Sequence, residues 1–430
     1  MMLTEIRKTD PISPEAESYA NYLLCLSLDI GEEMLKSGAE VHRVEDTVER
    51  ICYAYGAIHV EVFAITTLII AAVRMKDNSY SSQIRRVYNS SYSLSCLEQF
   101  NSISRRICRD TPPLEEVDGM IREAKEHRKY PFWLYLLGGC VTAATFTLFF
   151  GGSVRDALVA LLLGALVVGI DRIHSSYINQ LAKLLITSFV AGIFAYLGVF
   201  IGVGEHVDSI MIGTIMLLIP GLAFGNALRD LLWGDIMAGI MKTVQACLSA
   251  VLIAFGFMLA ALMMEELGMI RNAEPVAASV PVQLISAFFG TAGYALMFRS
   301  RVKYLPVVAV CGLVTYSVYL WVSSCGISPF FAAFLATMFT TVYSEICARV
   351  FHAPSIVFSF SGAISIVPGS GLYYTMKALL FGEGDLVYSN FKGTLLISAG
   401  IALGMVTVSI LTNGLTRLHK AKKEYIKEDK

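Results

Sequence analysis

The sequence predicts an all-α polytopic membrane protein, ten transmembrane helices arranged as two inverted five-helix repeats, preceded by a soluble α+β cytoplasmic domain. Its 430 residues are 55% hydrophobic and 16% charged, with a mean hydropathy of +0.60. Residues 1–130 hold 16 basic and 20 acidic residues, whereas residues 131–414 hold only 12 of each. A water-exposed surface needs roughly a quarter to a third charged residues, so the second region cannot be an ordinary soluble domain.

Residues 1–130 are expected to form the soluble domain, called the head below. Helical spacing of apolar residues, with Gly38 and Gly56 as stops, predicts helices over Pro14–Lys36 and Glu40–Tyr55. Runs of β-branched residues predict strands at Ile58–Ile65, Thr67–Val73 and Gln83–Tyr88, and two amphipathic helices follow at Leu94–Arg109 and Leu114–Lys129. The first residues contain no apolar core typical of a signal peptide, so we expect the head to stay in the cytoplasm.

A charged cluster on the second helix attracts a catalytic or metal interpretation: Glu40, His42, Arg43, Glu45 and Asp46. We interpret it as a solvated helix face with local ion pairs, because residues three apart are neighbours on one helix. His59 and Glu61 alternate on one strand face and are expected to be exposed. No GxSxG nucleophile pattern occurs, and the nine cysteines form no CxxC pair. We therefore expect no enzyme activity, no metal and no cofactor.

The second region contains ten apolar stretches, each near the ~20 residues that cross a bilayer. They are Phe132–Phe150, Val154–Ile170, Leu181–Ile201, Ser209–Leu232, Ile236–Met264, Val282–Phe298, Leu305–Val322, Ile327–Cys347, Pro354–Leu380 and Thr394–Thr412. Backbone groups in lipid must be satisfied internally, so these stretches are expected to be helices. The expected domains are residues 131–264 and 281–414 as two five-helix repeats, 265–280 as an external linker, and 415–430 as a cytoplasmic tail.

The loop charges predict the orientation in the cell membrane. With the head inside, eight basic residues fall on inner segments and four on outer segments, as the positive-inside rule requires. The N-terminal domain and the C-terminus are then both cytoplasmic. The expected partners are the lipid bilayer and a small-molecule substrate, and no basic segment with interleaved aromatic residues indicates nucleic acid.

An internal repeat is visible at an offset of 148 residues. Ile219-Pro-Gly221 matches Val367-Pro-Gly369, and the segment from Arg229 to Asp235 matches Lys377 to Glu383. Because each copy has five spans, the second copy enters the membrane in the opposite orientation. Inverted repeats of this kind are characteristic of secondary transporters.

The paired Pro-Gly sequences fall near the middle of spans four and nine, where they predict breaks that leave half-helix ends inside the protein. Such ends bind a carboxylate or a cation; a plain proline kink is the alternative. The expected substrate pathway comprises Pro220, Gly221, Asn226, Arg229, Asp230, Pro368, Gly369, Ser370, Tyr373 and Lys377. Asp235, Lys242, Asp385 and Lys392 are paired by the repeat after a two-residue insertion and are candidates for gating; simple snorkelling is the alternative for the basic residues.

Two passages resemble the threonine/serine exporter family. Residues 38–45, Gly-Ala-Glu-Val-His-Arg-Val-Glu, followed by the strand that ends at Thr67, are similar to its N-terminal signature. Residues 217–235, from Leu-Leu-Ile-Pro-Gly to Trp-Gly-Asp, are similar to its membrane signature and extend to Gly239. The resemblance covers the whole chain as a fused form and implies a ten-span exporter driven by the proton-motive force.

The resemblance leaves the substrate open between threonine or serine and a dicarboxylate such as succinate. The hydroxy amino acids need partners for an ammonium and a hydroxyl group, whereas a dicarboxylate favours two cations, for which Arg229 and Lys377 are available. In another class, a membrane-anchored hydrolase or sensor would act through the head, but an anchor needs only one or two spans. A channel is a third alternative, which saturable, gradient-dependent flux would distinguish.

Overall fold

The computed structural model describes residues 14–88, 92–126, 130–173, 179–218, 227, 230–231, 234–270 and 276–428. These residues are mostly helical, with one small antiparallel sheet near the N-terminus. The chain divides into two compact units. The head unit comprises residues 1–129 together with 230–241, and the membrane unit comprises residues 130–229 together with 242–430.

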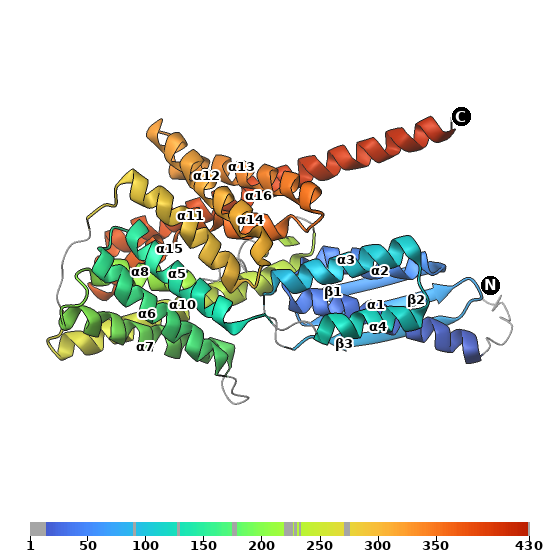
Figure 1. The fold of residues 1–430 in the computed structure, drawn as a ribbon, viewed down its shortest axis with the longest axis horizontal. Helices are drawn as coiled ribbons and strands as arrows, with labels where there is room; N and C mark the ends of the chain where they lie inside the picture. Colours follow the sequence, from blue (N-terminus) through green and yellow to red (C-terminus); the bar gives the residue numbers. More distant parts are fainter. Residues whose placement is uncertain are drawn as a thin grey trace, which may run out of the picture. The chain divides into compact units, whose positions relative to one another are not determined.

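The head unit is built on the sheet β1-β2-β3, whose strands are Ala57–Ile65, Leu68–Met75 and Tyr80–Arg86. Helices α1 (Pro14–Lys36) and α2 (Val41–Ala54) pack against it, and α3 (Leu94–Asp110) and α4 (Leu114–Glu126) pack against these helices (Figure 1). The predicted stripe of α2 is confirmed, since Val41, Val44, Val48 and Ile51 are all buried. This apolar stripe is what holds α2 against β1.

The third strand begins three residues earlier than the sequence predicts. Asp77 accepts hydrogen bonds from the backbone N–H and the hydroxyl of Ser79, at 2.9 and 2.7 Å, and Asn78 has a φ of 65°. These contacts close a tight turn, so pairing resumes at once, with Tyr80 opposite Arg74. The turn residues were expected, but their compactness was not.

The membrane unit contains helices at all ten predicted stretches. Their bounds are α5 (Phe132–Phe149), α6 (Val154–Arg172), α7 (Gln180–Phe200), α8 (Val207–Leu218), α10 (Ile236–Glu266), α11 (Val280–Met297), α12 (Leu305–Ser324), α13 (Pro329–Phe351), α14 (Ile356–Ala363) with α15 (Gly369–Leu380), and α16 (Gly384–Glu428). The first residues of α10 belong to the head unit. A short 3-10 helix, η1 (Val302–Tyr304), precedes α12, and another, η2 (Ile364–Ile366), follows α14.

Seven of these helices are long and apolar enough to cross a membrane, or eight if the bent pair formed by α14 with η2 and α15 counts as one span. The sequence predicts ten, and the difference lies in α6 and α8. Charged residues in the first and last turns of α6 leave an uncharged stretch, 157–170, that is shorter than the ~20 residues of a full span. Helix α8 has 12 described residues, and most of the remaining predicted span lies outside the described part of the chain.

The helices of the membrane unit recur at a constant interval. Helix α11 begins 148 residues after α5, and α16 begins 148 residues after α10. Helices α5 and α11 run antiparallel, because a Cβ added at Gly138 would lie 2.7 Å from the carbonyl oxygen of Gly293, whereas Gly151, at the other end of α5, approaches Val276 and Ala278. The first helices of the two predicted repeats therefore point in opposite directions.

The same turn occurs at two positions that the repeat pairs. Gly234 and Gly382 both have positive φ angles, 98° and 72°. The N–H of Asp235 donates to the carbonyl oxygen of Asp230, and the N–H of Glu383 donates to that of Ala378, both at 2.9 Å. Only a residue without a Cβ adopts this left-handed backbone cheaply, which explains the glycine in both copies.

Candidate transport site

The second Pro-Gly pair breaks its helix. Helix α14 and η2 end at Ile366, Val367 is extended, and α15 begins at Gly369, with a bend of 43° between the two segments. Pro368 has no backbone N–H to donate, so the helix cannot continue through it. The predicted break is confirmed here. The first pair, Pro220-Gly221, lies outside the described residues.

One turn beyond the break, Tyr373 and Lys377 share a face of α15, because they are four residues apart. Both bind the carboxylate of Asp208, at the start of α8. The hydroxyl of Tyr373 donates to Oδ1 at 2.6 Å, and the ammonium of Lys377 donates to Oδ2 at 2.5 Å. A residue from the first half of the membrane unit thus meets two residues from the second half. These three residues are called the Asp208 triad below.

The Asp208 triad is largely removed from solvent. Tyr373 is 2% exposed, and the side chains of Asp208 and Lys377 are 15% and 35% exposed. Asp208 lies in the first turn of α8, where the helix dipole favours a negative charge. A charge in an apolar helix of a membrane protein is costly unless it is paired, and such a pair marks a functional site by default.

The other predicted pathway residues fall in different places. Ser370 is half-buried in the first turn of α15, and Asp230 is buried in the head unit. Asn226 and Arg229 lie outside the described residues, so their predicted role stays a prediction.

The gating candidates do not behave alike. Asp235 belongs to the head unit, and Lys242 is half-buried in α10. Asp385 and Lys392 are exposed on α16, and the ammonium of Lys392 lies 5.8 Å from the ring centroid of Tyr388. No ion pair joins Asp385 to Lys392 within the described residues, so a gating role for this pair stays a prediction.

Sequence reasoning missed Asp208. It is 169 residues from Lys377 and has no acidic counterpart at the repeat offset, where Ile356 stands. One signal could have found it, because it is the only acidic residue of α8, directly before an apolar stretch.

In the head, the charged cluster of α2 is only partly the set of local ion pairs that the sequence predicts. Asp46 pairs with Arg50 at 2.7 Å, one turn along α2. Arg43 instead donates to the side chain of Asn101 on α3, at 3.1 Å, and Glu45 accepts the N–H of Ala64 on β1, at 2.7 Å. Burial, and secondarily the nearby Asp235 carboxylate, raise the pKa of Glu45, although the Ala64 hydrogen bond opposes them.

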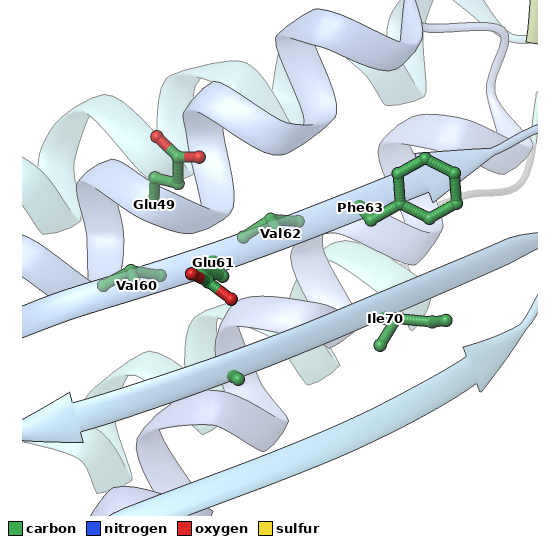
Figure 2. Close-up of a pocket in the computed structure, with 7 residues that line it drawn as sticks. Glu49, Val60, Glu61, Val62, Phe63 and Ile70 are labelled. Carbon is green, nitrogen blue, oxygen red and sulfur yellow. The ribbon is translucent and has the colours of Figure 1, made fainter. Parts of the chain in front are cut away.

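The expected exposure of His59 and Glu61 on β1 is confirmed, at 56% and 75%. A hollow of about 450 Å³ lies beside them, along β1 and β2 (Figure 2). Figure 2 shows Glu49 of α2 and Glu61 of β1 facing an otherwise apolar lining of Val60, Val62, Phe63, Ile70 and Ala72. The lining contains no nucleophilic side chain, so this hollow offers no basis for a hydrolase.

Comparison with known families covers nearly the whole chain. Residues 26–264 match the family model ThrE, described as "Putative threonine/serine exporter", and residues 283–411 match ThrE_2, described as "Threonine/Serine exporter, ThrE". The first match alone spans more than half of the chain.

Three curated proteins are similar to this chain. The "Threonine/serine exporter" of Corynebacterium glutamicum is 22% identical over 423 residues, which cover 95% of this chain and 86% of that protein. The "Probable succinate transporter subunit YjjP" of Klebsiella aerogenes is 25% identical over 249 residues, 57% of this chain and 95% of that protein. An uncharacterized protein of Schizosaccharomyces pombe is 27% identical over 165 residues, 36% of this chain and 20% of that protein. No solved structure matches the chain.

Proposed function

Because this chain belongs to the threonine/serine exporter family of multi-pass membrane transport proteins, we propose that it exports threonine or serine across the cell membrane, driven by the proton-motive force. The observation that carries the proposal is the Asp208 triad next to the break at Pro368. It gives the membrane unit a charged, half-enclosed group where a secondary transporter holds its substrate.

We further propose ten spans arranged as two inverted repeats. The constant offset of 148 residues and the antiparallel packing of α5 and α11 support the inversion. Two like pairs support the repeat. Gly256 of α10 packs on Leu185 and Ser188 of α7, and Gly400 of α16 packs on Phe330 and Ala333 of α13. Helices α6 and α8 would complete the ten spans, held among their neighbours rather than in lipid.

The ten-span arrangement, with the head and the C-terminus in the cytoplasm, assigns the Asp208 triad to the outer part of the pathway. There the ion pair would close the outer side, since it joins one repeat to the other. Protonation of Asp208 from outside would remove its charge and release Lys377. An entering proton would thereby open the outer side, which is the coupling that proton-driven export requires.

Threonine and serine fit the chemistry of the triad. Their ammonium group can replace Lys377 at Asp208, and their carboxylate can then bind the freed Lys377 or the first turn of α15, where Gly369 and Ser370 begin a helix. A dicarboxylate is the second candidate, favoured by the similarity to the succinate transporter subunit. It would compete for Lys377 alone and leave Asp208 without a cation.

The decisive experiment measures efflux from proteoliposomes with and without an imposed proton gradient, using threonine, serine and succinate as substrates. We expect the gradient to stimulate threonine or serine efflux, and Asp208→Asn to lower that stimulated efflux at least about tenfold. The matched control is Asp385→Asn, which neutralises an exposed carboxylate and should leave efflux unchanged.

Three outcomes would contradict the proposal. Succinate efflux alone would favour the dicarboxylate exporter, and flux that does not saturate would favour a channel. Unaltered gradient-driven efflux by Asp208→Asn would remove the triad from the mechanism. Absence of any flux, together with turnover by the head, would favour the membrane-anchored hydrolase or sensor.

A further inference from the structure

The head unit brings together three metal-ligating side chains that the sequence separates. His42 and Glu45 lie one turn apart on α2, and Asp235 belongs to the segment 230–241, which folds with the head. One ligand atom from each of the three lies within 4.8 Å of the others. Ligands that share one ion at about 2 Å each lie no more than ~4 Å apart, so small side-chain rotations would close the set around an ion.

Asp235 shows that this set is incomplete as it stands. Its Oδ2 atom is buried and has no hydrogen-bond partner within the described part of the chain. A buried carboxylate oxygen without a partner carries a large desolvation cost, so such an atom calls for a ligand. Glu45 is held for the same purpose, because the N–H of Ala64 orients its carboxylate, as outer-shell donors orient metal ligands.

A second cluster in the chain provides a contrast. Asp156, Glu205 and His206 lie equally close together. Both oxygens of Asp156 are already occupied, however. Oδ1 accepts the backbone N–H groups of Glu205 and His206, and Oδ2 accepts from the backbone of Ser153 and the ring of His206. That cluster ties the start of α6 to the loop before α8 and has no need of an ion.

We propose that His42, Glu45 and Asp235 bind one divalent transition-metal ion of the zinc type, which fixes the segment 230–241 to the head. One imidazole and two carboxylates suit such an ion, whereas Mg²⁺ takes oxygen ligands alone. The exposed side of His42 leaves room for the ion to enter and for a water molecule as fourth ligand. The sequence predicts no metal site here because His42 and Glu45 alone are ordinary helix neighbours.

The experiment uses the full chain in detergent, stripped with a chelator and then titrated with Zn²⁺ in a calorimeter. We expect one ion per chain, and at least an about tenfold weaker Kd for both Asp235→Asn and His42→Ala. The matched controls are Glu49→Gln, one turn further along α2, and His206→Asn in the contrasting cluster, and both should bind as the unaltered chain does. Co²⁺ should give the visible absorption of a coordinated ion, and Mg²⁺ should not compete.

Hydrogen exchange supplies a readout of the fixed segment. Zn²⁺ should slow amide exchange in residues 234–241 of the unaltered chain and not in Asp235→Asn. Undiminished binding by both ligand variants would overturn the proposal, as would loss of binding in His206→Asn alone, or no stoichiometric binding at all. If the Asp235→Asn chain is poorly folded, His42→Ala decides, because His42 is exposed and its loss leaves the core intact.

Discussion

Lys377 and Asp208 form a contact whose two partners cannot be removed independently. Lys377→Ala would leave the Asp208 carboxylate without its cation in a largely enclosed place. We expect this change to lower the free energy of unfolding by more than the ~1 kcal/mol of a surface pair and less than the ~3–5 kcal/mol of a fully buried one. Thermal unfolding in detergent measures it.

The double variant Asp208→Ala with Lys377→Ala separates stability from transport. Removing both charges should restore most of the lost stability, because no uncompensated charge remains. Efflux should stay at background. Recovery of efflux together with stability would show that the pair serves only the fold.

Cys52 of α2 is a buried residue whose chemistry the head controls. Burial raises the pKa of its thiol to about 11, although its hydrogen bond to Ser27 opposes the shift. We therefore expect almost no reaction with N-ethylmaleimide at pH 7.5 in the folded protein, whereas the exposed Cys325 reacts. Peptide mass spectrometry distinguishes the two sites.

The same raised pKa predicts an alkaline limit to stability. Folding favours the neutral thiol, so its contribution is complete below the ordinary pKa of about 9 and is lost as the pH rises toward 11. Cys52→Ala should lose less stability than the unaltered chain between these values. Parallel unfolding curves for the two proteins across this range would contradict the assignment.

Single residues also show how far sequence reasoning reaches. Pro368 and Gly369 could be recognised because their backbone chemistry is local, and the break is where the sequence predicts it. Asp208 with Lys377, and Asp235 with His42, could not be paired, because each contact joins residues more than 160 positions apart. Hydrophobic periodicity identifies buried faces, but it does not say which distant polar groups share them.

At the scale of elements, the interruption before α15 is the feature with the clearest consequence. Gly369 is buried at the first position of α15. A leucine there would add a side chain where backbone and substrate are proposed to approach. We expect Gly369→Leu to lower efflux at least about tenfold, or ~1.4 kcal/mol on the limiting step, at a normal protein level.

Gly393→Leu on α16 is the matched control, because a Cβ at that position meets no atom within 4 Å. It should export normally. Normal efflux by Gly369→Leu, at equal expression, would show that the break is a bend without a role in the pathway.

Element bounds were predicted closely wherever an apolar pattern and a stop residue agree, as for α1 and α13. They were predicted less well at β3 and α16. Two turn contacts of Asp77 start β3 early, and α16 continues to Glu428, beyond its predicted end at Thr412. Local propensity does not report how tightly a turn closes or how far a charged helix extends past its apolar part.

For the whole molecule, the proposed topology can be tested with a native residue. Cys325 lies exposed between α12 and α13, which the ten-span arrangement assigns to the outer side. A membrane-impermeant maleimide should label it in intact cells and should not label the Cys325→Ser variant.

In that Cys325→Ser background, a cysteine introduced by Arg301→Cys should be labelled only after the cells are permeabilised. Position 301 is exposed between α11 and η1, which the arrangement assigns to the inner side. The opposite labelling pattern at the two positions would invert the topology and place the head outside.

The close contact of α5 with α11 has a consequence for assembly. Gly138 and Gly293 bring the two helices together without side chains between them, and lipid gives such a contact little hydrophobic drive. In one chain the halves meet at an effective concentration in the millimolar range and always in equal number. The same surfaces on two separate polypeptides would have to associate by diffusion and by balanced synthesis. A fused chain can therefore function with an interface too weak to hold two subunits together.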